Sequence, residues 1–123
     1  MIMTEQNKIG DGLECSVYNV GNGRCYKGYK DEHELDKIYR AAKKAAAAGL
    51  GPDVYEKDDY GYYTEIVETF NNRRDFSSDE YDDLLQDLQE LFGSNIFDLH
   101  SGNVGRKDGR LVCIDFGIGI SIS

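Results

Sequence analysis

The sequence predicts an α+β domain, because segments with a two-residue repeat and segments with a helical repeat follow one another along the chain. Cys15 to Val20 and Arg24 to Tyr29 alternate in hydrophobicity and flank Gly21-Asn22-Gly23, a tight-turn signal. Segments 31–48 and 77–92 instead place apolar residues three and four positions apart, as a helix packed on one face requires. Together these patterns favour an antiparallel sheet with a helix packed against it.

The first half of the chain is predicted to contain five strands and one helix. Residues 8–29 supply three short strands. The helix over 31–48 is rich in alanine, which favours helix, and Gly49 ends it. A second hairpin joins 54–57 to 62–67. The expected order is therefore three strands, a helix and two strands.

The second half is predicted to contain one helix and one strand. A polar link at 71–75 precedes Ser77-Ser78-Asp79-Glu80, which has the form of a capping box, and Gly93 ends the helix that begins there. We interpret the many acidic residues of this helix as a solvated face. The apolar run Leu111–Ile114 is the predicted strand.

The bulk properties exclude several classes of function. A chain of 123 residues is expected to form a single domain over 1–123. Its net charge of −9 opposes binding to nucleic acid or to an anionic membrane surface. No apolar run reaches the roughly 20 residues needed to span a bilayer. The first ten residues lack a signal pattern, and the three cysteines fall in apolar runs, so the sequence predicts a cytoplasmic protein with reduced thiols.

Two carboxylates and one carboxamide gather near the C-terminus. Asp98 and Asn103 are five positions apart, and Asp115 follows twelve positions after Asn103. A carboxylate acceptor beside two further oxygen ligands suits proton handling next to Mg²⁺-bound phosphates. The alternative for each of these residues is a turn-forming Asp or Asn.

With D-L-H-S-G-N at 98–103 and D-F-G at 115–117, the sequence resembles the protein-kinase-like superfamily. The form D-L-H-x-G-N is similar to aminoglycoside phosphotransferases, lipopolysaccharide kinases and other atypical bacterial or phage kinases. The resemblance implies a protein-kinase-like α+β fold. A five-stranded antiparallel small lobe with one helix would occupy 1–68, and a truncated, mostly helical large lobe would occupy 69–123.

The same resemblance implies ATP and Mg²⁺ as cofactors. Asp98 would be the catalytic base or the group that orients the acceptor hydroxyl, and Asn103 and Asp115 would be the metal ligands. Gly10, Gly12 and Val17 would form the glycine-rich loop, where the lack of side chains lets backbone amides approach phosphates. Taken alone, the two glycines also fit a plain hairpin turn.

Lys27 falls at the position of the family's strand-three lysine, which neutralises phosphate oxygens. Glu34 is the implied carboxylate partner of Lys27, and Glu32 is the substitute. Glu68, at the end of a segment similar to the family's hinge, would contact a ribose hydroxyl. For Lys27 and Glu68 the alternative is a solvated side chain.

Two functions from different classes follow. The first is a minimal kinase-like phosphotransferase that transfers the γ-phosphoryl group of Mg-ATP to a hydroxyl of a protein or small molecule. The alternative is a pseudokinase-like binding module that docks on a partner protein, with or without nucleotide. Only six residues follow Gly117. Because the family's large-lobe helices are missing, we expect a protein partner or a homodimer to cover the surface that they leave exposed.

Overall fold

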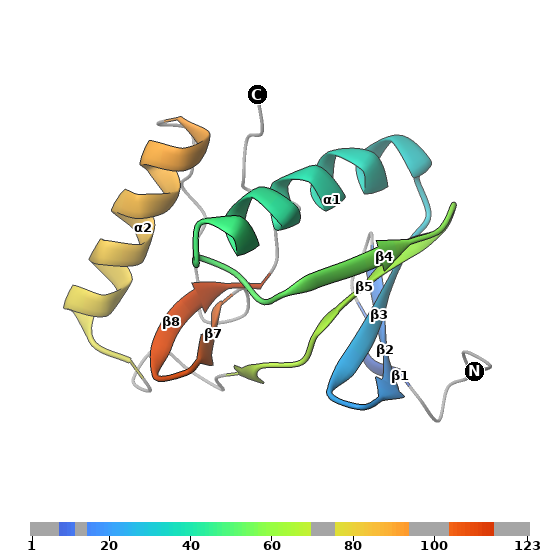
Figure 1. The fold of residues 1–123 in the computed structure, drawn as a ribbon, viewed down its shortest axis with the longest axis horizontal. Helices are drawn as coiled ribbons and strands as arrows, with labels where there is room; N and C mark the ends of the chain where they lie inside the picture. Colours follow the sequence, from blue (N-terminus) through green and yellow to red (C-terminus); the bar gives the residue numbers. More distant parts are fainter. Residues whose placement is uncertain (1–7, 12–14, 70–75, 94–103, 115–123) are drawn as a thin grey trace.

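The computed structural model describes residues 8–11, 15–69, 76–93 and 104–114. It confirms the α+β class: helix α1 packs on a five-stranded antiparallel sheet, and helix α2 packs beside a second, three-stranded sheet (Figure 1). No described helix is both long enough and apolar enough to cross a membrane. All three cysteines are free thiols, and Cys25 and Cys113 are buried.

The five predicted strands of the first sheet are present and all neighbours are antiparallel, in the order β1-β2-β3-β5-β4. The turn between β2 and β3 places Asn22 and Gly23 at φ values of 57° and 74°. Asn and Gly tolerate this left-handed region better than other residues, which is why the G-N-G signal marks a hairpin. The strands are β1 (Lys8–Asp11), β2 (Cys15–Gly21), β3 (Arg24–Tyr29), β4 (Val54–Lys57) and β5 (Gly61–Glu65).

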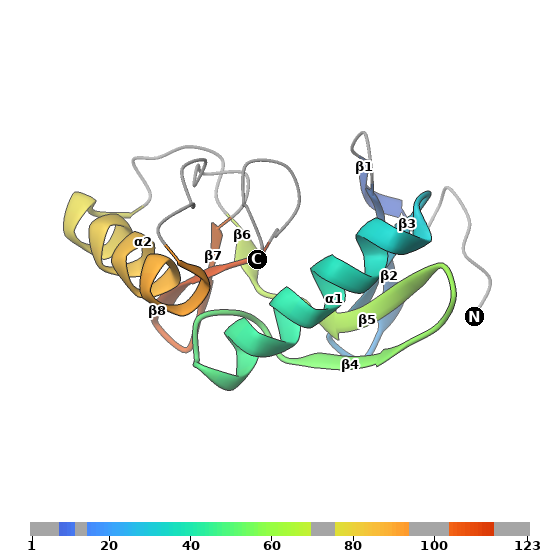
Figure 2. The ribbon, with the colours of Figure 1, turned by 90° about the horizontal axis from the view of Figure 1, so that it is seen from above.

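Helix α1 (Glu32–Ala47) lies across one face of this sheet (Figures 1 and 2). The Asp31 carboxylate caps its N-terminus by accepting hydrogen bonds from the amides of His33 and Glu34. On the sheet, Tyr62 is fully buried, and its ring meets that of Tyr39 from the helix. The helix buries an apolar stripe with the predicted spacing: Leu35, Ile38, Ala41, Ala42 and Ala45.

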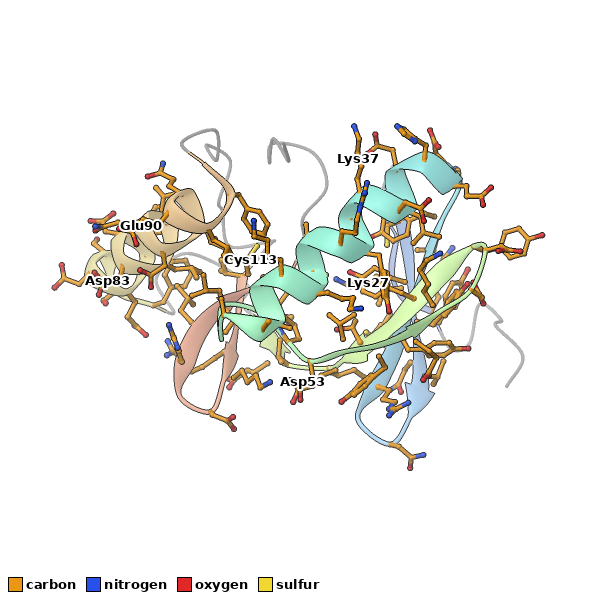
Figure 3. All side chains as sticks on the ribbon, turned by 45° about the horizontal axis from the view of Figure 1, so that its top comes forward. Lys27, Lys37, Asp53, Asp83, Glu90 and Cys113 are labelled. Atoms are coloured by element: carbon orange, nitrogen blue, oxygen red, sulfur yellow. The ribbon has the colours of Figure 1, made fainter. Side chains whose placement is uncertain are left out.

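Helix α2 (Ser78–Phe92) begins at the predicted capping box. The Ser77 hydroxyl accepts from the Glu80 amide at 3.1 Å, and the Glu80 carboxylate accepts from the Ser77 amide at 3.1 Å. Leu84, Leu88 and Phe92 form its buried face. Asp83 and Glu90 point away from the molecule on the outer face of the helix, as expected for a solvated acidic surface (Figure 3).

The second sheet consists of β6 (Glu68–Thr69), β7 (Val104–Lys107) and β8 (Arg110–Cys113) in the order β6-β7-β8. Only β8 corresponds to a strand that the sequence predicted. The part of the chain after residue 69, expected to be mostly helical, therefore combines α2 with a β-hairpin in its described residues. Asp108 and Gly109 form the turn of that hairpin, with φ values of 52° and 79°, so the D-G pair was the local signal for it.

The two sheets share one hydrophobic core. Residues of α1, β5, α2, β7 and β8 belong to a single buried cluster, and Leu35, Leu88, Val104 and Cys113 within it have no exposed surface. The backbone amide of Cys113 also donates to the carbonyl of Leu50 at 2.8 Å, which fastens β8 to the segment after α1. Separation of the two sheets would therefore expose apolar surface.

The β4–β5 turn is held by a tyrosine hydroxyl from β3. Tyr26 is buried and donates a hydrogen bond to the Asp58 carboxylate at 2.8 Å, and the same oxygen accepts from the amides of Tyr60 and Gly61. Burial and this hydrogen bond raise the pKa of Tyr26. Partial burial opposes ionisation of Asp58, but the three hydrogen bonds outweigh it and hold the Asp58 pKa below its usual value.

Replacing Tyr26 with phenylalanine should lower the free energy of unfolding by about 1–2 kcal/mol, because the variant loses one hydrogen bond to a charged group. The ring packing between residues 26 and 63, whose centroids lie 4.9 Å apart, should remain. Urea titration monitored by circular dichroism measures the change. The control Tyr60→Phe removes a hydroxyl from a side chain that is 74% exposed, and it should change stability by less than about 0.5 kcal/mol. Equal effects of the two variants would contradict the role of Tyr26.

Glu80 also joins α2 to the second sheet. Its carboxylate accepts a hydrogen bond from Arg106 of β7 at 2.8 Å, and the two side chains form an ion pair. The hydrogen bond from Arg106 is the main cause of a lowered Glu80 pKa, and the bond from the Ser77 amide adds to it. The same bond raises the pKa of Arg106.

Stability should therefore fall at acid pH, in part because of Glu80. A carboxyl with a lowered pKa binds fewer protons in the folded state than in the unfolded state. Its contribution is present above the ordinary pKa of 4.5 and is lost as the pH falls through the lower folded value. Urea unfolding across this range should show a shallower acid limb for Glu80→Gln and a partly flattened one for Arg106→Leu. An unchanged limb in Glu80→Gln would contradict the assignment.

Candidate functional site

Three of the residues that the sequence singles out lie in one row across the first sheet. Gly10 of β1 stands opposite Val17 of β2, and Val17 stands opposite Lys27 of β3. The row continues to Tyr62 of β5. Residues directly opposite in an antiparallel pair project from the same face. Because Tyr62 contacts α1, the half-buried side chains of Val17 and Lys27 share the face that the helix covers.

Lys27 connects this row to the second sheet. Figure 3 shows the residue between α1 and the five-stranded sheet. Its Nζ donates a hydrogen bond to the carbonyl oxygen of Ile114, which is 87 positions further along the chain. Ile114 follows β8 and immediately precedes Asp115. The fold thus brings the strand-three lysine to the residue next to a predicted metal ligand.

The remaining predicted residues of the C-terminal motifs lie outside the described residues. These are Asp98, Asn103 and Asp115, and Gly12 of the predicted glycine-rich loop is also outside them. The described residues alone contain no group of three or more His, Cys, Asp or Glu side chains that could hold a metal ion. The oxygen ligands of Asn103 and Asp115 therefore stay a prediction from the sequence.

The carboxylates proposed as partners of Lys27 lie in the first turn of α1. Glu34 is half-buried and Glu32 is exposed. In the part of the chain that the structure describes, neither of them forms an ion pair with Lys27. The ammonium group donates instead to the carbonyl of Ile114, which follows β8.

Lys27 also affects a buried thiol on its own strand. Cys25 is two positions before Lys27, and it therefore projects from the same face of β3. Burial raises the pKa of the Cys25 thiol, and the positive charge of Lys27 offsets part of that rise. The raised pKa keeps Cys25 in its neutral form at ordinary pH, so this thiol is unsuited to act as a nucleophile.

The predicted hinge corresponds to the connection between the two sheets. β5 ends at Glu65, Ile66 and Val67 form the link, and Glu68 begins β6. The sequence predicted Glu68 at the end of the small lobe. In the structure it instead belongs to the second sheet, opposite Arg106. The Ile66 amide is engaged, since it donates to the Gly23 carbonyl at 2.8 Å.

Gly105 of β7 lets the link and the end of β8 come together, and no sequence motif singled it out. A Cβ at this position would lie 2.7 Å from the Glu68 carbonyl and 2.8 Å from Val67 Cγ2. The Ile114 side chain is also close, at 3.3 Å. The missing side chain thus permits the approach of two segments, one of which carries the carbonyl bound by Lys27.

Gly105→Ala should destabilise the protein by about 2–3 kcal/mol, since the methyl group would force β6 or Val67 to move. Gly109→Ala is the matched control. Its φ of +79° strains an alanine, but a Cβ there meets no atom within 4 Å, so the expected cost is about 1 kcal/mol. Urea unfolding compares the two. A smaller loss for Gly105→Ala than for Gly109→Ala would show that the close approach is not a packing constraint.

A scan of protein-family models found no match to this chain, and a search of curated proteins found no significant relative.

Proposed function

We propose that this chain is a minimal kinase-like phosphotransferase of the protein-kinase-like superfamily, with Mg-ATP as the phosphoryl donor. The observation that supports this most strongly is the hydrogen bond from Lys27 to the carbonyl of Ile114. It joins a lysine on the third strand to the residue before the Asp-Phe-Gly motif, although 87 positions separate the two in sequence. Kinases need these two elements on either side of the bound phosphates.

The arrangement of the elements supports the same proposal. A five-stranded antiparallel sheet with one helix between its third and fourth strands has the form of a kinase small lobe. Gly10 lies in the same row as Lys27, with Val17 between them, so a residue of the proposed glycine-rich loop and the lysine belong to the same part of the sheet. The hairpin of β7 and β8 separates Asn103 from Asp115. Such a hairpin can return two oxygen ligands to one place.

Each residue of the proposed site has a distinct role. Lys27 neutralises phosphate oxygens of the nucleotide. Asp98 orients the acceptor hydroxyl and accepts its proton, which an ordinary carboxylate can do when transfer depends on positioning. Asn103 and Asp115 supply oxygen ligands, and the Mg²⁺ that they would hold neutralises charge on the transferred group. Glu68, at the start of β6, would contact a ribose hydroxyl.

One observation favours the alternative function, a pseudokinase-like module that docks on a partner protein. Active kinases need the ion pair between the strand-three lysine and a helix glutamate. Within the described residues Lys27 forms no such pair with Glu34. In the docking function this arrangement is the resting state of the protein. In the enzyme, nucleotide must draw Lys27 from Ile114 toward the phosphates.

Thermal unfolding with Mg-ATP tests nucleotide binding. A nucleotide concentration about 100-fold above Kd should stabilise the protein by about 2.7 kcal/mol, and the effect should require Mg²⁺. Lys27→Met should weaken binding at least about tenfold, because it removes the cation that meets the phosphates. Lys57→Met is the matched control: Lys57 lies two strands from Lys27, on the edge strand β4, and pairs with Asp36 of α1 at 3.3 Å, so its loss should not affect binding.

Turnover separates the two functions. Wild-type protein should transfer the γ-phosphoryl group of labelled ATP to water, to itself or to an added hydroxyl acceptor. Asp98→Asn should abolish transfer and keep the Mg-ATP stabilisation. Stabilisation without transfer in the wild type would favour the docking module. The absence of any Mg²⁺-dependent stabilisation would refute both nucleotide-binding forms of the proposal.

A further inference from the structure

Lys107, at the end of β7, makes two ion pairs that cross from the second sheet to the first. Its Nζ lies 2.9 Å from Asp53 Oδ1 and 3.0 Å from Glu65 Oε1. Asp53 directly precedes β4, and Glu65 is the last residue of β5, next to the link between the sheets. We refer to Lys107, Asp53 and Glu65 as the Lys107 cluster.

The two acids of the cluster are fixed within the first sheet. Glu65 Oε1 accepts a hydrogen bond from the Asp53 amide at 3.0 Å. The Asp53 carbonyl in turn accepts from the Glu65 amide at 2.9 Å and from the buried Thr64 hydroxyl at 2.8 Å. The acids therefore form a rigid acceptor site on the first sheet, and Lys107 is the member contributed by the second sheet.

The Lys107 cluster is partly shielded from water, so its ion pairs can help to hold the two sheets together. The side chains of Lys107 and Glu65 are 23% and 28% exposed, whereas that of Asp53 is 59% exposed and lies at the edge of the molecule (Figure 3). The hydrogen bond to Asp53, with that to Glu65, raises the pKa of Lys107 and keeps it charged. Partly buried ion pairs are screened less by salt than exposed ones.

We propose that Lys107 is a positioning residue that holds the second sheet against the first and thereby keeps the end of β8 within reach of Lys27. β7 and β8 form one hairpin, so a tie on β7 also restrains Ile114, which follows β8. One consequence of this proposal rests on the proposed function. If nucleotide binds between the two sheets, loss of the tie should speed its release and rebinding.

Two buried cysteines, one in each sheet, make the opening measurable without nucleotide. Cys113 of β8 is fully buried, and its amide donates to the carbonyl of Leu50, in the segment between α1 and β4. Cys25 lies inside β3 and is 5% exposed. Separation of the sheets should expose Cys113, whereas labelling of Cys25 needs the first sheet to unfold. A rise in the ratio of Cys113 to Cys25 labelling therefore reports opening of the sheets, because global unfolding exposes both thiols together.

The test is pulsed N-ethylmaleimide labelling of the full chain, resolved by peptide mass spectrometry. Lys107→Met should raise the ratio of Cys113 to Cys25 labelling by about threefold to fivefold, the range that two partly exposed ion pairs support. Lys107→Arg, which keeps the charge and the hydrogen bonds, should restore the wild-type ratio. Lys57→Met removes an ion pair between β4 and α1. This pair does not involve the second sheet, so the ratio should stay unchanged.

An unchanged ratio in Lys107→Met, or an equal rise in Lys57→Met, would overturn the proposal. Failure of Lys107→Arg to restore the ratio would also overturn it, because a charge-based tie must tolerate another cation. The dissociation rate of a fluorescent ATP analogue is measured on the same variants. A changed labelling ratio in a protein that binds no nucleotide would support the tie and refute the proposed function. Nucleotide binding with an unchanged labelling ratio would support the proposed function and refute the tie.

Discussion

The packing of α1 across the first sheet is the interaction on which the rest of the structure depends. It buries Leu35 and Ile38 on the helix and Tyr62 on the sheet, and these side chains form the centre of the core. Lys27 projects from the same face. A cation on a half-buried face needs an acceptor, and the Ile114 carbonyl supplies one. The packing of the helix and the position of β8 are therefore linked through one ammonium group.

The second sheet is held to the first by contacts of several kinds. Apolar side chains of β7 and β8 complete the shared core, and the Cys113 amide bonds to the Leu50 carbonyl. Gly105 allows close contact with the link, and Lys107 adds ion pairs at the edge. The hydrophobic contacts supply most of the stability, because burial of apolar surface outweighs partly exposed ion pairs. The polar contacts set the geometry, since they are directional.

Local signals sufficed for the elements that the sequence predicted. The alternation around the G-N-G turn and the alanine-rich repeat identified the first three strands and α1, and the capping box identified the start of α2. β6 escaped prediction because a strand of two residues has no measurable repeat, and its existence depends on pairing with β7. The D-G pair is a signal for the second hairpin. The strand β7 was missed because the residues of β7 and β8 next to this turn are charged and show no alternation in hydrophobicity.

For the candidate site too, part could be predicted from the sequence and part required the tertiary structure. The sequence by itself determined which side chains carry suitable chemistry: a lysine on the third strand, glycines near the first turn, and oxygen ligands in the C-terminal motifs. Only the tertiary structure decided that Gly10, Val17 and Lys27 share a row, and that Lys27 bonds to the carbonyl of Ile114. Strand register and contacts between distant segments arise from the packing of the whole chain, so no short stretch of sequence encodes them.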